Sequence, residues 1–141
     1  WNVEEMVNAV ELLESMDIHQ ISLADTVGVA TPQQVAEVFS AVNAQYDYLE
    51  IGCHLHSRPD QASAKVLAAY DAGCRRFDSA IGGLGGCPFA QDELIGNIPT
   101  ERVIEAFKQR GIAVPIQKPL DAVMKMSADI TEKFNAAADS H

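Results

Sequence analysis

Basic residues and long apolar runs are scarce in this sequence, and each shortage excludes a class of partner. Lys and Arg number 10 against 20 Asp and Glu, so the formal net charge is −10. Nucleic acids and anionic membranes bind basic surfaces, and we therefore expect neither as a partner. No apolar run approaches the roughly 20 residues of a membrane-spanning helix. An anionic small substrate stays compatible with this charge, because a site can be locally positive.

Cysteine is also scarce, and its spacing argues against two kinds of stabilised fold. The chain has three, Cys53, Cys74 and Cys87, without a Cys-x-x-Cys pair. This pattern argues against a disulfide framework and against a zinc knuckle. Free thiols are typical of a reducing compartment, so we expect a cytoplasmic protein, with the matrix of an organelle as the alternative. We interpret Cys53 and Cys74, which fall on apolar faces, as core residues.

Apolar strand patterns recur at a fixed distance along the chain. Ile21, Leu49 and Phe77 begin three of them, each 28 residues after the last. Helical patterns lie between them, and strand, helix, strand at this period indicates the βα units of a parallel sheet. The composition, 48% apolar and 21% charged, is typical of a globular domain. The strands are predicted over residues 21–24, 48–56 and 75–81.

The predicted helices have recognisable starts and ends. Thr31 and Pro32 are typical of an N-cap and a first helical residue. We expect Thr100 to cap a later helix that ends at Gly111, and a last helix to cover residues 119–134. A glycine-rich loop replaces the helix expected after the third strand. The chain opens at Trp1 on a helical pattern, so we interpret it as part of a longer polypeptide.

The strand over residues 48–56 places two histidines on its polar face. His54 and His56 alternate with apolar residues that face the opposite way. In a β/α barrel the polar face would line the interior, with both imidazoles near the carboxyl end, where barrels hold their chemistry. The pair is close enough to share a divalent cation. The alternative is two hydrogen-bonded histidines at a sheet end.

Three further residues carry candidate chemistry, each with a structural alternative. Cys87 lies among glycines, where a thiol could transfer a proton; it could equally be a small residue tolerated in a loop. Asp25 ends a strand and could orient a substrate hydroxyl or cap its own loop. Asn97 could supply a neutral oxygen ligand or serve as a turn asparagine.

Together these motifs resemble the 3-hydroxy-3-methylglutaryl-CoA (HMG-CoA) lyase family. The segment GGLGGCPFA, at residues 82–90, is similar to the family's signature loop. ISLADTVGVATP, at residues 21–32, looks like its fifth-strand segment, and HLH, at residues 54–56, like its paired-histidine motif. The resemblance implies an α/β fold: the second half, about strands 5–8, of a (β/α)8 TIM barrel. Residues 1–141 would form this single half-barrel, with residues 112–141 as a C-terminal helical extension.

The resemblance also implies roles for individual residues. His54 and His56 would bind Mg²⁺ or Mn²⁺, and Asn97, at the end of the eighth strand, would be a further ligand. Cys87 would be the loop acid/base, with His54 and Asp25 also in the catalytic set. Gly83, Gly85 and Gly86 would form the substrate-binding loop. The implied reaction is retro-Claisen cleavage of HMG-CoA to acetyl-CoA and acetoacetate.

Two departures from the family pattern keep alternatives open. Ser57-Arg58-Pro59 follows the second histidine, where the family has an acidic residue or asparagine and then threonine. This favours a related metal-dependent aldolase or a Claisen-type acyltransferase, such as a homocitrate or isopropylmalate synthase, as the runner-up. The first half of a barrel is also missing, so we expect this segment alone to be inactive. It would close the barrel with that missing half or by self-association, as a homo-oligomer; a non-catalytic scaffold is the third hypothesis.

Overall fold

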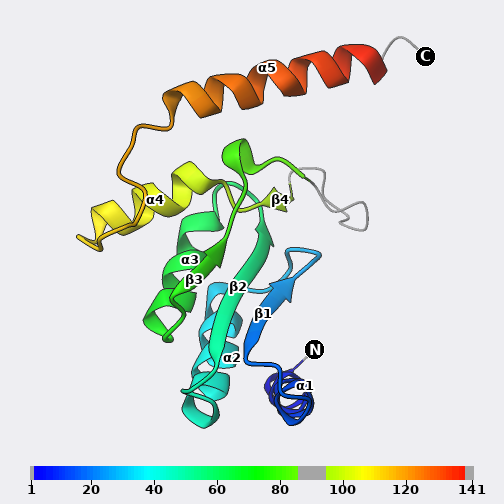
Figure 1. The fold of residues 1–141 in the computed structure, drawn as a ribbon, viewed down its shortest axis with the longest axis vertical. Coiled ribbons are helices and arrows are strands. Elements are labelled where there is room, and N and C mark those ends of the chain that lie inside the picture. The colour runs from blue at the N-terminus through cyan, green and yellow to red at the C-terminus, as the bar shows by residue number, and fades with distance from the viewer. Residues whose placement is uncertain (1, 86–94, 139–141) are drawn as a thin grey trace.

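The computed structural model describes residues 2–85 and 95–138, with side chains described as far as Lys133. Helices and strands alternate along most of this length (Figure 1). The last helix lies beyond the carboxyl ends of the strands (Figure 1). The elements are α1 (Val3–Ser15), β1 (Gln20–Asp25), α2 (Pro32–Gln45), β2 (Glu50–Ser57), α3 (Ala62–Asp71), β3 (Arg76–Asp78), the 3₁₀ turn η1 (Ile81–Gly83), β4 (Gly96–Asn97), α4 (Thr100–Gln109) and α5 (Asp121–Ala138).

Two helices begin at capping boxes that their sequences encode. The Thr31 side chain accepts a hydrogen bond from the backbone N–H of Gln34, whose own side chain accepts one from Thr31. Pro32 follows at the first helical position, where its missing N–H costs nothing. Asn2 and Glu5 form the same arrangement at the start of α1. The predicted start of α2 is therefore confirmed.

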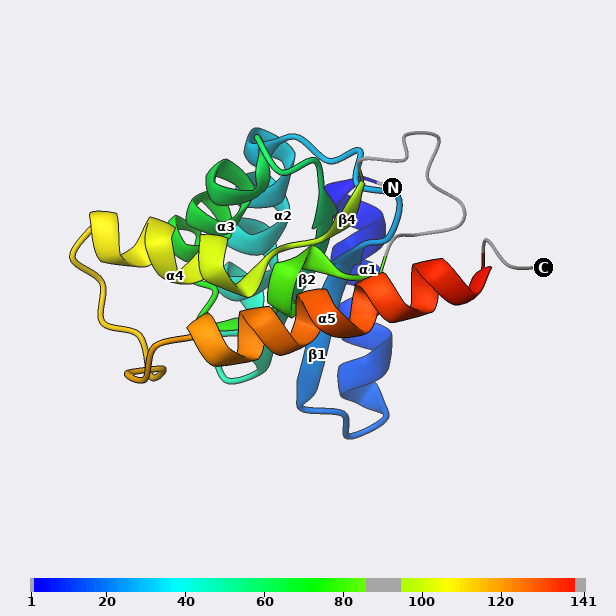
Figure 2. The same cartoon turned by 90° about the horizontal axis from the view of Figure 1, so that it is seen from above.

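The sheet is parallel, as the 28-residue spacing predicts. β2 lies between β1 and β3, with Ile21 opposite Ile51 and Cys53 opposite Phe77. Helices α2 and α3 lie side by side on one face of the sheet (Figure 2). The residues buried in the core between the sheet and these helices include Ile51, Cys53 and Leu55 of β2, which confirms the predicted apolar face.

Three predicted boundaries are wrong. The third strand ends at Asp78, because the chain turns into η1 where a strand was predicted to continue to residue 81. Thr100 is the first residue of α4 and Pro99 occupies the cap position without a side-chain hydrogen bond. The last helix begins at Asp121, two residues later than expected, and ends at Ala138, four residues later than expected.

The fourth strand also differs from the expectation of an eighth strand in one parallel barrel. β4 has two residues and pairs antiparallel with the end of β2, with Asn97 opposite His56. In the described part of the chain, the segment after β3 and the segment after β4 form one isolated parallel bridge, between Ala80 and Pro99.

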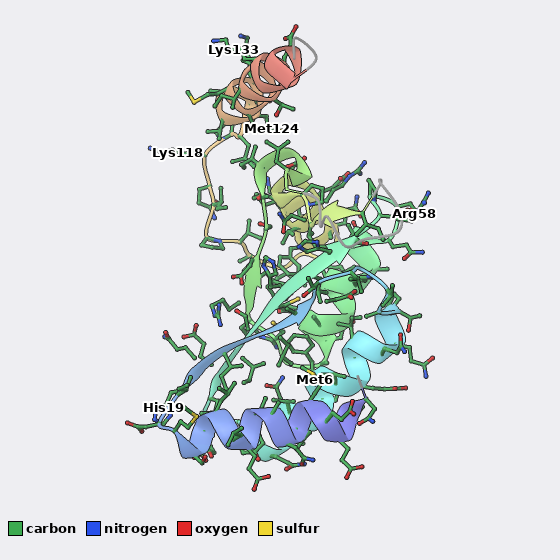
Figure 3. The ribbon with its side chains drawn as sticks, turned by 90° about the vertical axis from the view of Figure 1, so that its right-hand side faces the viewer. Met6, His19, Arg58, Lys118, Met124 and Lys133 are labelled. Carbon is green, nitrogen blue, oxygen red and sulfur yellow. The ribbon has the colours of Figure 1, made fainter. Side chains whose placement is uncertain are left out.

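One edge of the sheet and one groove face outward. Within residues 2–85 and 95–138, β1 pairs with β2 alone. Beside it, a groove of about 800 Å³ runs between α1, β1 and α2, lined by residues that include Met6, Val29 and Val38. Figure 3 shows Met6 on α1, at the opposite end of the molecule from α5. No helix in the described part of the chain is long and apolar enough to cross a membrane.

Candidate metal centre and its surroundings

β2 brings the two predicted histidines together at its carboxyl end. Their ring centroids lie 5.5 Å apart, because residues two apart on a strand project from the same face. His54 is half-buried, whereas His56 is 8% exposed. Leu55, between them, faces the core and fixes the rotation of the strand.

His56 has the properties of an available ligand. Its Nδ1 is buried and has no hydrogen-bond partner in the described part of the chain. A buried polar atom without a partner is costly and calls for an explanation, of which an absent ion is one. Burial lowers the pKa of His56, and the neighbouring His54 lowers it further. The imidazole is therefore held neutral, which is the form that binds a cation.

A carboxylate stands behind the first histidine. The Asp78 Oδ2 lies 3.7 Å from His54 Nδ1 and accepts a hydrogen bond from the Ser22 hydroxyl at 3.2 Å. Asp78 comes from β3 and Ser22 from β1, so the carboxylate spans the sheet in front of β2. A carboxylate beside an imidazole is the usual device that orients a metal-binding histidine.

Asn97 lies next to the histidines, where the sequence predicts a ligand. β4 places it directly opposite His56. Its Nδ2 donates hydrogen bonds to the carbonyls of Leu84 and Gly85, at 2.7 and 3.0 Å. The amide nitrogen is therefore committed to the loop, which leaves the carbonyl oxygen as the ligand atom.

The substrate-loop residues are described in part. Gly83 and Gly85 lie beside Asn97, whose backbone N–H donates to the Gly85 carbonyl at 3.3 Å. Gly86 and Cys87 lie outside the described residues. Cys53 and Cys74 are buried, which confirms their assignment to the core. The adjacent Cys74 thiol and burial raise the pKa of Cys53 far above its ordinary value, so it stays a protonated thiol.

Asp25 holds its own loop together. One carboxylate oxygen accepts the backbone N–H of Val29 at 3.1 Å, and the other accepts that of Ala30 at 3.0 Å and the Lys65 ammonium at 3.0 Å. The side chain is 9% exposed. The geometry is that of the loop cap, one of the two interpretations from sequence. Contact with a substrate hydroxyl stays a prediction.

Lys65 is the residue that sequence reasoning misses. It is fully buried on α3, and its ammonium reaches the carboxyl ends of β1 and β2. The available signal is its position: it falls on the same helical stripe as Ala62, Val66 and Ala69, where a lysine has no place unless it is paired.

The donor set fits a divalent cation of the Mg²⁺ or Mn²⁺ type. Among the described residues, no group of three or more His, Cys, Asp and Glu side chains is arranged to hold a metal. The set here consists of two imidazoles and one amide oxygen, and the orphaned Nδ1 of His56 is the observation that supports it. Imidazole and carbonyl ligands suit Mn²⁺, and water or substrate would complete its coordination.

Comparison with known proteins shows the family to which the chain is similar. The HMGL-like family model matches residues 1–130. The chain is 33% identical over 132 residues to hydroxymethylglutaryl-CoA lyase YngG of Bacillus subtilis, covering 94% of this chain and 43% of that protein. It is 38% identical over 108 residues to (R)-citramalyl-CoA lyase of Chloroflexus aurantiacus, covering 77% and 33%. The chain thus spans less than half the length of these relatives.

Solved structures agree with this similarity. The chain matches the HMG-CoA lyase of Bacillus subtilis with a TM-score of 0.82 at 32% identity, over 96% of this chain and 44% of that one. It matches an HMG-CoA lyase from Acinetobacter baumannii, in complex with coenzyme A and 3-methylmalate, with a TM-score of 0.72 at 41% identity, over 81% and 37%. The α/β fold with a parallel sheet is therefore that of a barrel family.

Proposed function

The chain belongs to the HMGL-like family, and on that premise we propose that it forms part of a metal-dependent lyase. The substrate would be HMG-CoA, cleaved to acetyl-CoA and acetoacetate. The observation that carries this proposal is the cluster of His54, His56 and Asn97 at the carboxyl end of β2. Chemistry at the carboxyl ends of parallel strands is typical of barrel enzymes.

The chain's own residues would divide the work. His54, His56 and Asn97 would hold Mg²⁺ or Mn²⁺, which supplies Lewis-acid polarisation of the substrate's hydroxyl and carboxylate oxygens when bound. Asp25, at the mouth, would orient that hydroxyl. The hydroxyl proton would pass to the Asp25 carboxylate, and the ketone of acetoacetate would form as the carbon–carbon bond breaks. The electron pair passes to the thioester fragment, whose carbon takes a proton from the Cys87 thiol to give acetyl-CoA.

The segment would be the second half of a barrel, completed by another part of the polypeptide or by a second copy. The unpaired edge of β1 and the groove of about 800 Å³ beside it support this proposal. An exposed strand edge is a pairing surface. By this reasoning the 141 residues alone would be inactive, because they would form only one half of the barrel. The groove is also compatible with the non-catalytic scaffold hypothesis. Acetoacetate release by the complete polypeptide would exclude that hypothesis.

A second substrate is favoured by one residue at the mouth. Arg58 follows β2 directly and lies at the same end of the molecule as β4 (Figure 3). Its side chain is 42% exposed, and its Nε lies 3.5 Å from the Asp60 carboxylate. A cation there suits a substrate with a differently placed carboxylate. We therefore keep (R)-citramalyl-CoA, the substrate in one relative's name, and the Claisen-type acyltransferases as alternatives.

The deciding experiment measures acetoacetate release from HMG-CoA with Mn²⁺, using the complete natural polypeptide. We expect release by the parent and a loss of about 10²–10⁴-fold in kcat for Cys87→Ala, the range for a removed acid/base. Lys133→Ala, a change on the exposed side of α5, is the control and should keep parental activity. No release from HMG-CoA, with cleavage of citramalyl-CoA instead, would transfer the proposal to the second substrate.

A further inference from the structure

Lys65 is an ammonium placed where a protein rarely tolerates one. Its side chain is fully buried on the apolar stripe of α3. An ionised group without water costs several kcal/mol or more unless it is paired and hydrogen-bonded. An apolar residue could replace this buried charge. The role of Lys65 is therefore to be found in the groups that its ammonium binds.

All three ammonium protons are used, and each goes to the mouth of the sheet. Lys65 Nζ donates to Asp25 Oδ2 at 3.0 Å, to the Gly28 carbonyl at 3.0 Å and to the His56 carbonyl at 3.1 Å. These acceptors belong to the end of β1, the loop after it and the end of β2. One side chain thus ties together three segments that the sequence separates by up to 31 residues.

The loop after β1 also packs directly on the end of β2. Gly28 has a φ of +70°, and a Cβ there would lie 2.6 Å from Ile95 Cγ2 and 3.3 Å from the carbonyl carbon and oxygen of His56. The loop is closed from inside by the Asp25 carboxylate, which accepts the N–H groups of Val29 and Ala30. The backbone of His56 is therefore held by the loop and by Lys65 together.

The ring of His56 lacks the side-chain neighbour that the ring of His54 has. His54 has the Asp78 carboxylate near its Nδ1, whereas His56 Nδ1 has no partner in residues 2–85 and 95–138. We propose that Lys65 is a positioning residue that sets the His56 imidazole for the metal by fixing the His56 carbonyl and the Asp25–Ala30 loop. This inference rests on the proposed metal site, and it assigns a role to a residue outside the ligand set.

The test uses Lys65→Met in the complete natural polypeptide. Methionine has nearly the same length and is apolar, so it keeps the packing and removes the three hydrogen bonds together with the positive charge that pairs with Asp25. We expect Mn²⁺ to bind about 10-fold more weakly, the lower end of the range for lost outer-shell support. Amide hydrogen exchange of Val29 and Ala30 should become faster. Lys133→Met, on the exposed side of α5 (Figure 3), is the matched control and should leave both readouts unchanged.

The outcomes separate this proposal from the proposed function. Parental Mn²⁺ affinity and parental exchange in a folded Lys65→Met protein would overturn the positioning role and leave the metal site standing. A parent protein that binds no Mn²⁺ would overturn both. If Lys65→Met does not fold, Lys65→Arg decides. Its guanidinium keeps the charge but cannot present the same three protons, and unchanged Mn²⁺ affinity in that variant would overturn the proposal.

Discussion

Gly28 shows how much a single residue decides at the mouth of this sheet. Its positive φ disfavours other residues on backbone grounds, and its missing Cβ admits the His56 carbonyl and the Ile95 side chain. The sequence contains nine glycines, and nothing in composition separates this one from the rest. Its role emerges only when β1 and β2 are paired and their ends meet.

We expect Gly28→Ala to lower the free energy of unfolding by about 1–3 kcal/mol, because the new Cβ meets both backbone strain and a close contact. Urea denaturation measures the change. Gly111→Ala is the control: Gly111 has nearly the same φ, +69°, but nothing within 4 Å of the added Cβ. That variant should lose only the strain energy, about 1 kcal/mol. Equal losses in the two variants would show that the contact with His56 contributes nothing.

Within the candidate site, the sequence allowed prediction only of residues whose type is a common metal ligand. The histidine pair stands out by type and spacing, whereas Asn97 had a turn asparagine as its alternative; the structure brings the three together. The resemblance to a family supplied their roles. Lys65 was missed because a lysine on a helix is ordinarily exposed. Its burial depends on an acceptor, Asp25, 40 residues earlier in the chain.

At the scale of elements, α3 is joined to the end of α4 by one charged pair. Arg110 donates two hydrogen bonds to the Asp71 carboxylate, at 2.9 and 3.0 Å, and lowers the pKa of Asp71 from its ordinary 3.8. A carboxyl group whose pKa is lower in the folded state than in the unfolded state stabilises the folded protein at pH values above its unfolded-state pKa. That stabilisation is lost as the pH falls through the folded pKa.

We therefore expect Asp71→Asn to reduce the free energy of unfolding at pH 7, and the difference from the parent to shrink as the pH falls below about 4 and to disappear below the folded pKa of Asp71. Urea denaturation across that pH range checks both statements. Both side chains are about half exposed, so the effect at pH 7 is small. Asp129→Asn, which breaks an exposed pair within α5, should change stability less, because it joins no two elements. A difference that persists at low pH would exclude the ion pair as its cause.

Secondary structure follows the sequence where local signals agree with packing. The sequence predicts both the capping box of α2 and the apolar face of β2. β3 and β4 were misjudged, because their extent is set by neighbours. η1 ends β3 after three residues, and β4 is ordered by its pairing with β2. Neither of these contacts leaves a periodic pattern in the sequence.

For the whole molecule, the exposed edge of β1 has a measurable consequence. Val29, 73% exposed, lines the groove between α1, β1 and α2. We expect the isolated 141-residue chain to associate as its concentration rises, and Val29→Lys to shift it toward the monomer, because an ammonium group is costly to bury in an apolar contact. Sedimentation velocity measures the shift.

Met126→Lys is the control for that experiment. Met126 is 62% exposed on α5, away from the groove. If its variant disperses the chain and Val29→Lys does not, the contact surface is on α5 and the groove is not the closing surface. The parallel sheet was predictable from the 28-residue period, but the unpaired edge was predictable only from the resemblance to a longer family.

β2 is bonded on both sides, to β1 and β3 along its length and to β4 at its end. The amides of such a strand exchange with solvent only when the domain as a whole opens, while terminal helices fray at little cost. We therefore expect the two imidazoles to lie on the segment with the highest free energy of local unfolding. Limited proteolysis that trims α1 or α5 would remove the periphery first and leave the ligands on an intact strand.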